Sequence, residues 1–126
     1  MGYNTDFKGV IEFDKEISEK LKDEINEFCD KRHCLSETGQ GINTTPDYAP
    51  GLWCNWLVTN DRKGLTWNCT EKSYEMDKWL VVLIKRFLKP KGLTCNGEVE
   101  AQGEKVGNHW LMVVVDNVLT VKHAGF

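Results

Sequence analysis

Large aromatic, amide and cationic side chains cluster in the central part of this 126-residue sequence, and their chemistry is the kind that binds nucleotides. An indole ring offers a flat surface on which a base can stack, while amides and cations can hydrogen-bond a base edge or a phosphate. We predict a site for a nucleotide-type ligand. The side chains predicted to form it are Trp53, Asn55, Trp56, Arg62, Trp67, Lys72, Tyr74 and Asn96.

The spacing of Trp53 and Trp56 supports this prediction. Both lie in an alternating run, residues 52–59, that predicts a β-strand. Side chains three positions apart on a strand point to opposite faces, so helices on one face can bury at most one of these rings. We expect the other ring either to be an exposed binding platform or to be covered by another part of the chain or a second copy of the protein.

A second predicted site is acidic and binds a partner. Polar residues alternate with small ones along the segment 93–104, and the polar residues are Glu98, Glu100, Gln102 and Glu104. On a strand, such side chains project together at a spacing of about 7 Å. This row predicts a contact with a basic partner or a hard cation, and its alternative interpretation is the solvated face of a sheet.

Residues typical of metal sites and catalysis form no complete pattern. Cys29 and His33 lie four apart on a predicted helix, beside Cys34, but the sequence offers no second Cys/His pair to complete a zinc site. The histidines, among them His109 and His123, match no triad with a serine or cysteine. We therefore predict no metal, no cofactor and no catalytic residue, with a small hydrolase as an alternative.

The elements that position these residues follow from hydrophobic spacing. Strands are predicted at 3–13, 52–59, 65–67, 93–104, 109–115 and 118–121, and helices from Ser18 to near Arg32 or His33 and from Tyr74 to Leu88. On the second helix, Trp79 falls one position off the main apolar stripe, which predicts half-burial. Just before it, Lys72 could bind an anion at the helix start, or Glu71 could cap the helix.

The order of these elements, β-α-β-β-α-β-β-β, predicts an α+β fold. We expect a mostly antiparallel sheet with two helices on one face, a ferredoxin-like split βαβ arrangement extended by a C-terminal hairpin. The length fits a single domain, 1–126, with a long loop at about 34–50 that is either a functional lid or a spacer.

Composition narrows the class of function. The formal net charge of −3 and the sequence pI of about 5.6 argue against general binding to nucleic acid or to anionic membranes. No apolar segment predicts a signal peptide or a membrane span. Five cysteines without a C-x-x-C pair are typical of reduced thiols in a cytosolic protein.

Several short segments together resemble a family of small, uncharacterised proteins encoded by bacteriophages and prophages. The pattern is G-Y-N-T-x-F-x-G from Gly2, P-G-L-W-C-x-W from Pro50, E-K-x-Y from Glu71 and N-G-E-V-x-x-Q-G-E from Asn96. Residues 34–49 depart most from the family. The resemblance implies a phage origin and action in the host cell cytoplasm, and it brings no catalytic residue.

A compact phage protein of this kind suggests, by analogy, a role against host defence. We expect a non-enzymatic, homo-oligomeric protein that sequesters a nucleotide-derived immune signal. The alternative is an inhibitor of a host defence protein, either anti-CRISPR-like or a nucleic-acid mimic that uses the acidic row.

Overall fold

The computed structural model describes residues 5–30, 53–70, 73, 75–104 and 108–123. The helices and strands are β1 (Thr5–Phe13), α1 (Glu19–Cys29), β2 (Trp56–Val58), β3 (Gly64–Trp67), α2 (Met76–Leu83), β4 (Cys95–Gly103), β5 (His109–Val115) and β6 (Val118–His123). Helix α2 continues through a π-helical turn, Ile84–Leu88, and a 3₁₀ turn, Lys89–Lys91. The predicted α+β class is confirmed.

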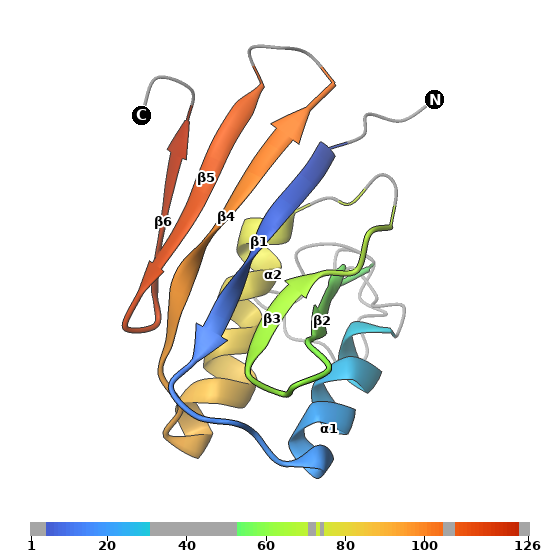
Figure 1. The fold of residues 1–126 in the computed structure, drawn as a ribbon, viewed down its shortest axis with the longest axis vertical. Coiled ribbons are helices and arrows are strands. Elements are labelled where there is room, and N and C mark those ends of the chain that lie inside the picture. Colours follow the sequence, from blue (N-terminus) through green and yellow to red (C-terminus); the bar gives the residue numbers. More distant parts are fainter. Residues whose placement is uncertain (1–4, 31–52, 71–72, 74, 105–107, 124–126) are drawn as a thin grey trace, which may run out of the picture.

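The six strands form one antiparallel sheet in the order β2-β3-β1-β4-β5-β6 (Figure 1). Its centre is the pairing of β1 with β4, which runs from Thr5 opposite Gly103 to Phe13 opposite Cys95. Strands β5 and β6 join through the predicted two-residue turn Asp116–Asn117. Both turn residues have positive φ, 49° and 71°, as the tight turns of hairpins require.

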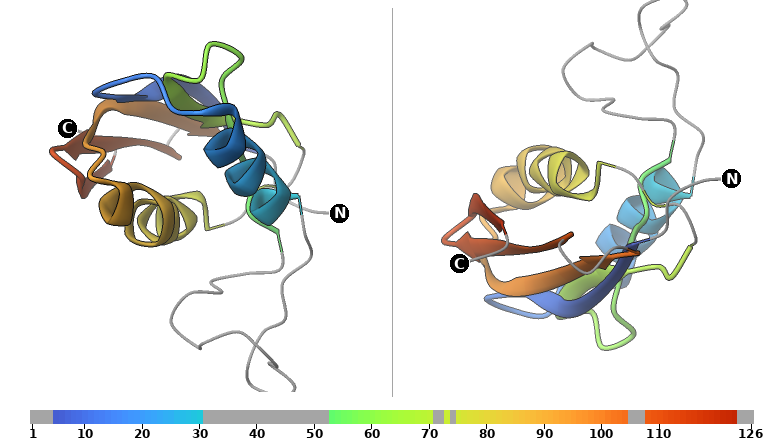
Figure 2. Two further views of the ribbon diagram at one scale, coloured as in Figure 1. Left: turned by 90° about the horizontal axis from the view of Figure 1, so that it is seen from below. Right: turned by 90° about the horizontal axis from the view of Figure 1, so that it is seen from above.

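Two glycines allow the backbones of β1 and β4 to approach each other closely. Gly97 has φ of +152°, and a Cβ atom there would lie 2.5 Å from the carbonyl oxygen of Val10. Gly9 has φ of +128°, and its Cβ would lie 2.2 Å from the carbonyl oxygen of Glu98. Only glycine fits both the conformation and the space. These two glycines therefore allow the backbones of β1 and β4 to pair closely at the centre of the sheet, which curves over the helices in Figure 2.

Both helices lie on the same, concave face of the sheet (Figure 2). Helix α1 begins as predicted, because the Ser18 hydroxyl accepts a hydrogen bond from the Leu21 N–H at 3.1 Å. Its buried side chains are Leu21, Ile25, Phe28 and Cys29. The described helix ends at Cys29, and the predicted end near Arg32 or His33 lies outside the described residues.

The predicted stripe of α2 and its π-helical turn is buried except for the partly buried Phe87, and its buried members are Met76, Leu80, Leu83, Ile84 and Leu88. Helix α2 also buries Trp79, which is fully enclosed rather than half-buried. The prediction for Trp79 was wrong because α2 packs against α1 as well as the sheet. The Phe28 ring of α1 meets the Trp79 ring at 6.0 Å between centroids, close to edge-to-face. A helix covered on two sides has a wider buried surface than one stripe.

The start of α2 also differs from the prediction. The helix begins at Met76, and its N-cap is Glu75, which has φ of 57° and makes no side-chain capping hydrogen bond. The predicted capping residue, Glu71, lies outside the described residues. Residues 71, 72 and 74 lie outside the described part of the chain, so the predicted anion site at Lys72 stays a prediction.

The alternation of side chains along the strands separates a core from an open face. Most inward side chains of β1, β4 and β5 are buried, and the buried ones are Phe7, Ile11, Phe13, Cys95, Val99, Ala101, Met112 and Val114. The outward ones face away from both helices. Among the described helices, none has the length and apolar character needed to cross a membrane.

Candidate functional site

Trp53 and Trp56 were predicted to lie on one strand, but only Trp56 belongs to it. Strand β2 begins at Trp56, so Trp53 precedes it and the strand-parity argument does not apply. Trp56 is buried, with 1% of its surface exposed, whereas Trp53 is 48% exposed. At most one of the two rings joins the core, as predicted, but the exposure of Trp53 does not arise from the strand's alternation. Among the described aromatic residues of the predicted site, Trp53 is the one that is exposed to solvent.

Trp56 on β2 is paired with Trp67 on β3. The Trp56 ring lies in the hydrophobic core, and the Trp67 ring packs against it. The Trp56 indole N–H donates to the Met76 carbonyl oxygen at 2.9 Å, which ties β2 to the start of α2. The Trp67 indole N–H donates to the Ser73 hydroxyl at 2.9 Å. Both indole N–H groups therefore have hydrogen-bond partners within the protein, one in the buried core and one at a partly buried position.

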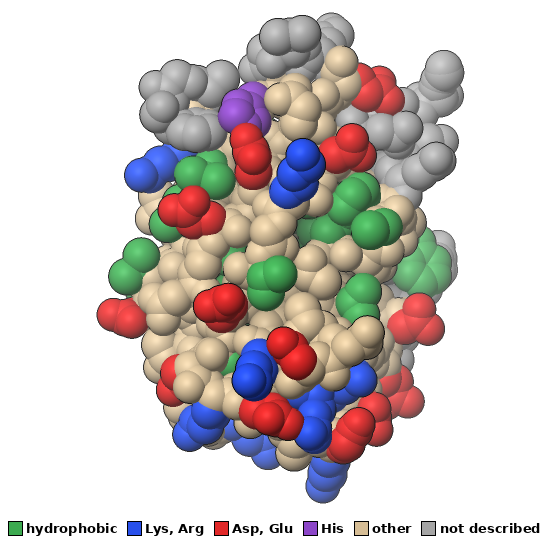
Figure 3. All heavy atoms as spheres, viewed as in Figure 1, with side chains coloured by type: hydrophobic (Ala, Val, Ile, Leu, Met, Phe, Trp, Pro, Cys, Tyr) green, Lys and Arg blue, Asp and Glu red, His purple; other side chains and the backbone are tan. Residues whose placement is uncertain are grey.

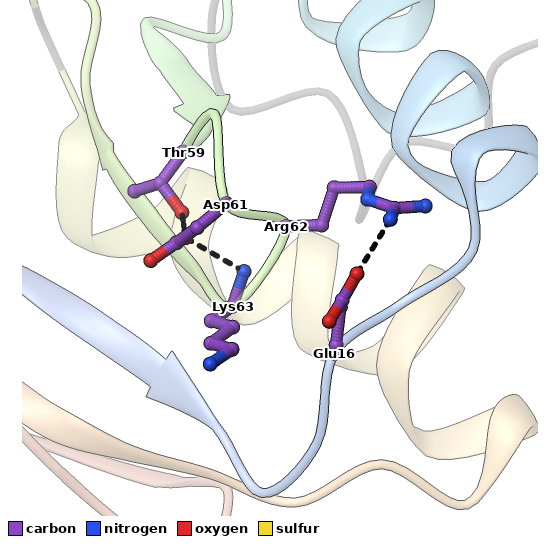
Figure 4. Close-up of polar contacts among 5 residues, drawn as sticks. All are labelled: Glu16, Thr59, Asp61, Arg62 and Lys63. Carbon is purple, nitrogen blue, oxygen red and sulfur yellow. Dashed lines mark hydrogen bonds and ion pairs between the residues drawn. The ribbon is translucent and has the colours of Figure 1, made fainter.

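The described cationic and amide side chains of the predicted site also interact with other groups of the protein. Arg62, in the turn after β2, forms an ion pair with Glu16 at 2.5 Å (Figure 4). In the same turn the Asp61 carboxylate accepts hydrogen bonds from the Thr59 hydroxyl and the Lys63 backbone N–H, which lower the pKa of Asp61. This network fixes the hairpin turn.

Asn55 and Asn96 lie in different parts of the molecule. Asn55 is buried before β2, and its side-chain Oδ1 accepts a hydrogen bond from the Asn68 Nδ2 at 3.5 Å, while its backbone carbonyl oxygen accepts one from the Asn68 backbone N–H at 3.1 Å. Asn96, on the open face of β4, accepts a hydrogen bond from the Asp116 N–H at 2.8 Å. Lys72 and Tyr74 are outside the described residues. The structure therefore does not gather the described members of the predicted ligand site.

A groove between α1 and β2 includes one of the predicted ligand residues, Trp56, in its lining. It encloses about 420 Å³, and its lining residues are Asn26, Glu27, Cys29, Asp30, Trp56, Leu57 and Asn68. The Asn26 side-chain oxygen accepts a hydrogen bond from the Val58 N–H at 2.9 Å, which pairs the outer edge of the sheet with α1. The charged lining residues, Glu27 and Asp30, are both acidic, which disfavours a phosphate.

Sequence reasoning missed Asn26 and Asn68 in this groove. Asn26 falls on the polar side of α1 and resembles any solvated helix residue. Its partner Val58 is 32 positions away, so the spacing of residues along the chain gave no signal for the contact.

The predicted acidic row, in contrast, is assembled on one face. Glu98, Glu100 and Gln102 are exposed on β4, while the residues between them turn inward. Glu104 follows the strand and is also exposed. Figure 3 shows the open face with acidic and basic side chains interspersed with single apolar ones.

Strand β1 extends this row sideways. The register places Asp6 opposite Gln102 and Lys8 opposite Glu100, and these four residues line a shallow hollow of about 260 Å³. On the other side of β4, the His109 Nε2 lies 2.6 Å from a carboxylate oxygen of Glu100. The sequence did not predict these neighbours, because strand register depends on contacts between distant segments.

We define the open face by the outward side chains of β1, β4 and β5 together with Val118 and Lys122 of β6. The acidic members are Asp6, Glu12, Glu98 and Glu100, and the basic members are Lys8 and Lys122. Apolar members lie between the charges, where Val10 and Val113 flank Glu98, and the most exposed are at one end, where Val115 and Val118 are 58% and 64% exposed. The face therefore combines acidic side chains on β4 with apolar side chains beside them and at one end.

The described residues contain no group of three or more His, Cys, Asp or Glu side chains able to hold a metal ion. Cys29, half of the zinc pair considered from the sequence, instead lies against Cys54 inside the core. His33 and Cys34 are outside the described residues.

No family model, curated protein or solved structure matches this chain. Its function is therefore inferred from the residues and their geometry.

Proposed function

We propose that the protein is a non-enzymatic binding protein whose open face contacts a basic surface on a protein partner. The observation that supports this proposal is the row of Glu98, Glu100 and Gln102 on a central strand, flanked by Asp6 on β1. The row is exposed and lies on the face away from both helices. A rigid sheet presents these groups at fixed spacing, which limits the entropy lost on binding.

The composition of the open face suits a protein partner better than an ion. Carboxylates near the centre attract Lys and Arg side chains and raise the association rate, whereas Val115 and Val118 provide apolar surface for burial. Lys8 and Lys122 impose a pattern of charge that a partner must match. Specificity then comes from complementary charges as well as from contact area.

The resemblance to phage proteins suggests where the protein acts and which kind of partner it binds. The protein is a phage-encoded anti-defence inhibitor that acts in the host cytoplasm, and its partner is a host defence protein with a basic surface. Nucleic-acid-binding surfaces are basic, so the acidic row acts as a nucleic-acid mimic.

The groove supports the nucleotide-ligand alternative less well. Its described lining carries the acidic residues Glu27 and Asp30 and no Lys or Arg, and the predicted stacking residue Trp56 is buried. Sequestration of a nucleotide-derived signal, a homo-oligomeric state and a small hydrolase activity remain predictions from the sequence.

We also propose that the first part of the fold is a ferredoxin-like split βαβ unit. The support is the element order β1-α1-β2-β3-α2-β4 combined with the sheet order β2-β3-β1-β4, in which every neighbouring pair is antiparallel. Strands β5 and β6 then extend the β4 edge.

Charge reversal tests the binding proposal. The immobilised protein, the double variant Glu98→Lys/Glu100→Lys and a matched control, Asp23→Lys/Glu24→Lys on exposed positions of α1, are compared for retention of proteins from a bacterial lysate. Both variants change the net charge equally. We expect a salt-sensitive partner to bind the wild type and the control but not the open-face variant, with at least a tenfold loss of affinity, or about 1.4 kcal/mol. Equal retention by all three proteins would contradict the proposal.

A further inference from the structure

Two buried thiols meet where the end of α1 approaches the start of β2. The Sγ atoms of Cys29 and Cys54 are 3.2 Å apart, although the residues are separated by 25 positions in the sequence. Cys29 is 5% exposed and Cys54 is fully buried. We propose that this pair is an oxidation site at which hydrogen peroxide converts the two thiols into an intramolecular disulfide.

The surrounding structure holds the two sulfur atoms together. Cys29 is the last residue of α1, and Cys54 lies two residues before β2. The hydrogen bond between Asn26 and the Val58 N–H fixes the same two segments to each other at 2.9 Å. A disulfide has an S–S length of about 2.05 Å, so the sulfur atoms must approach by about 1 Å. Small side-chain rotations can supply such a movement without separating helix and strand.

Access differs between the two thiols. Cys29 lines the groove, whose volume of about 420 Å³ is larger than a peroxide molecule, whereas Cys54 is fully buried and is not among the described lining residues. Cys29 therefore reacts first. Its contact with Cys54 and its burial raise the pKa of the Cys29 thiol, so Cys29 is protonated at rest and reacts more slowly than an exposed cysteine.

The reaction balances with peroxide as the only co-reactant. Cys29 loses its thiol proton, and its sulfur attacks one peroxide oxygen, breaking the O–O bond to give a sulfenic acid and, after proton transfer, one water. The Cys54 sulfur then attacks the Cys29 sulfur, forming the S–S bond and releasing the hydroxyl group with the Cys54 proton as a second water. Two thiols are oxidised, and one peroxide is reduced to two waters.

The full chain carrying Cys69→Ser is the protein to test, because Cys69 is exposed and would otherwise form links between molecules. After treatment with hydrogen peroxide, intact-mass measurement is expected to show a monomer that has lost two hydrogens. Peptide mapping is expected to join Cys29 to Cys54, and dithiothreitol to restore the original mass. The variants Cys29→Ala and Cys54→Ala, in the same background, are expected not to form this product. Cys95→Ala, which removes another buried thiol, is expected to form it as before.

The bond would enclose 24 residues between its cysteines, so it constrains the unfolded chain and is expected to raise Tm by roughly 10 °C, reversibly. A link from Cys29 to Cys34, oxidation only to sulfinic acid, or two intact thiols after peroxide treatment would each overturn the proposal. A linked protein that melts no higher than the reduced one would show that the native positions do not accommodate the bond.

Discussion

Replacing Gly97 with alanine tests whether close pairing of β1 and β4 is what assembles the open face. Gly97 has φ of +152°, and an added Cβ would lie 2.5 Å from the Val10 carbonyl oxygen and 3.1 Å from the Ile11 Cα. The atoms in the way are backbone atoms of the central strand pair. They cannot move aside without disturbing the register that places Val10 opposite Glu98.

The expected magnitude follows from two terms. A non-glycine residue in this backbone region costs about 1–3 kcal/mol in strain, and overpacking against a fixed backbone costs about 1–3 kcal/mol more. Gly92→Ala is the matched control, because Gly92 has φ of +73° but a Cβ there would meet nothing within 4 Å. Its strain of about 1–2 kcal/mol is partly offset by about 0.4–1 kcal/mol from the lower entropy of the unfolded chain.

Urea unfolding followed by tryptophan fluorescence measures both variants, since Trp56 and Trp79 are buried in the folded state. We expect Gly97→Ala to lower the free energy of unfolding by about 2–6 kcal/mol and Gly92→Ala by at most about 1.6 kcal/mol. If Gly97→Ala were no more destabilising than Gly92→Ala, the close approach of β1 to β4 would not exist as described.

Three further predictions concern the groove and the core. Trp56→Phe loses a buried indole hydrogen bond and is expected to destabilise the protein by about 1–3 kcal/mol in urea unfolding, whereas Trp53→Phe, at an exposed site, is expected to change stability by less than about 0.5 kcal/mol. Asn26→Ala leaves the Val58 N–H without its acceptor and is expected to cost about 1–3 kcal/mol, and an unchanged urea midpoint would argue against this edge contact. Burial, with a smaller contribution from the charge of Asp14, raises the pKa of Cys95 from 9.0 to about 11. The unfolded chain therefore loses this proton first, and stability falls as pH rises from 9.0 to about 11. Thermal melts across this range are expected to show a smaller fall for Cys95→Ala, and an equal fall would contradict the assignment.

Local patterns predicted the parts of the fold that depend on nearby residues. Ser18 capped α1 as expected, and the alternation of β4 placed Val99 inside and Glu98 outside. The turn at Asp116–Asn117 also followed from its residue types. In each case the hydrophobic period and the local hydrogen bonding favour the same structure.

The remaining features depend on contacts between distant segments. Trp79 is buried because α1 covers it. Trp56 is buried on β2, whereas Trp53 lies before that strand and is exposed. The groove exists because Asn26 pairs with Val58, and the thiol pair exists because Cys29 meets Cys54. Sequence periodicity carries no information about which surfaces of two elements meet, so the predicted ligand residues did not assemble into one site.

Carboxyl footprinting is the most direct test of the proposal that the open face binds a basic partner. The protein, alone and in complex with the partner captured from the lysate, is labelled with a carbodiimide and an amine, and modification of each carboxylate is read by peptide mass spectrometry. We expect Glu98 and Glu100 to be labelled in the free protein and protected in the complex, while Asp23 and Glu24 on α1 are labelled equally in both. Protection of Asp23 and Glu24, with Glu98 and Glu100 still labelled, would contradict the account.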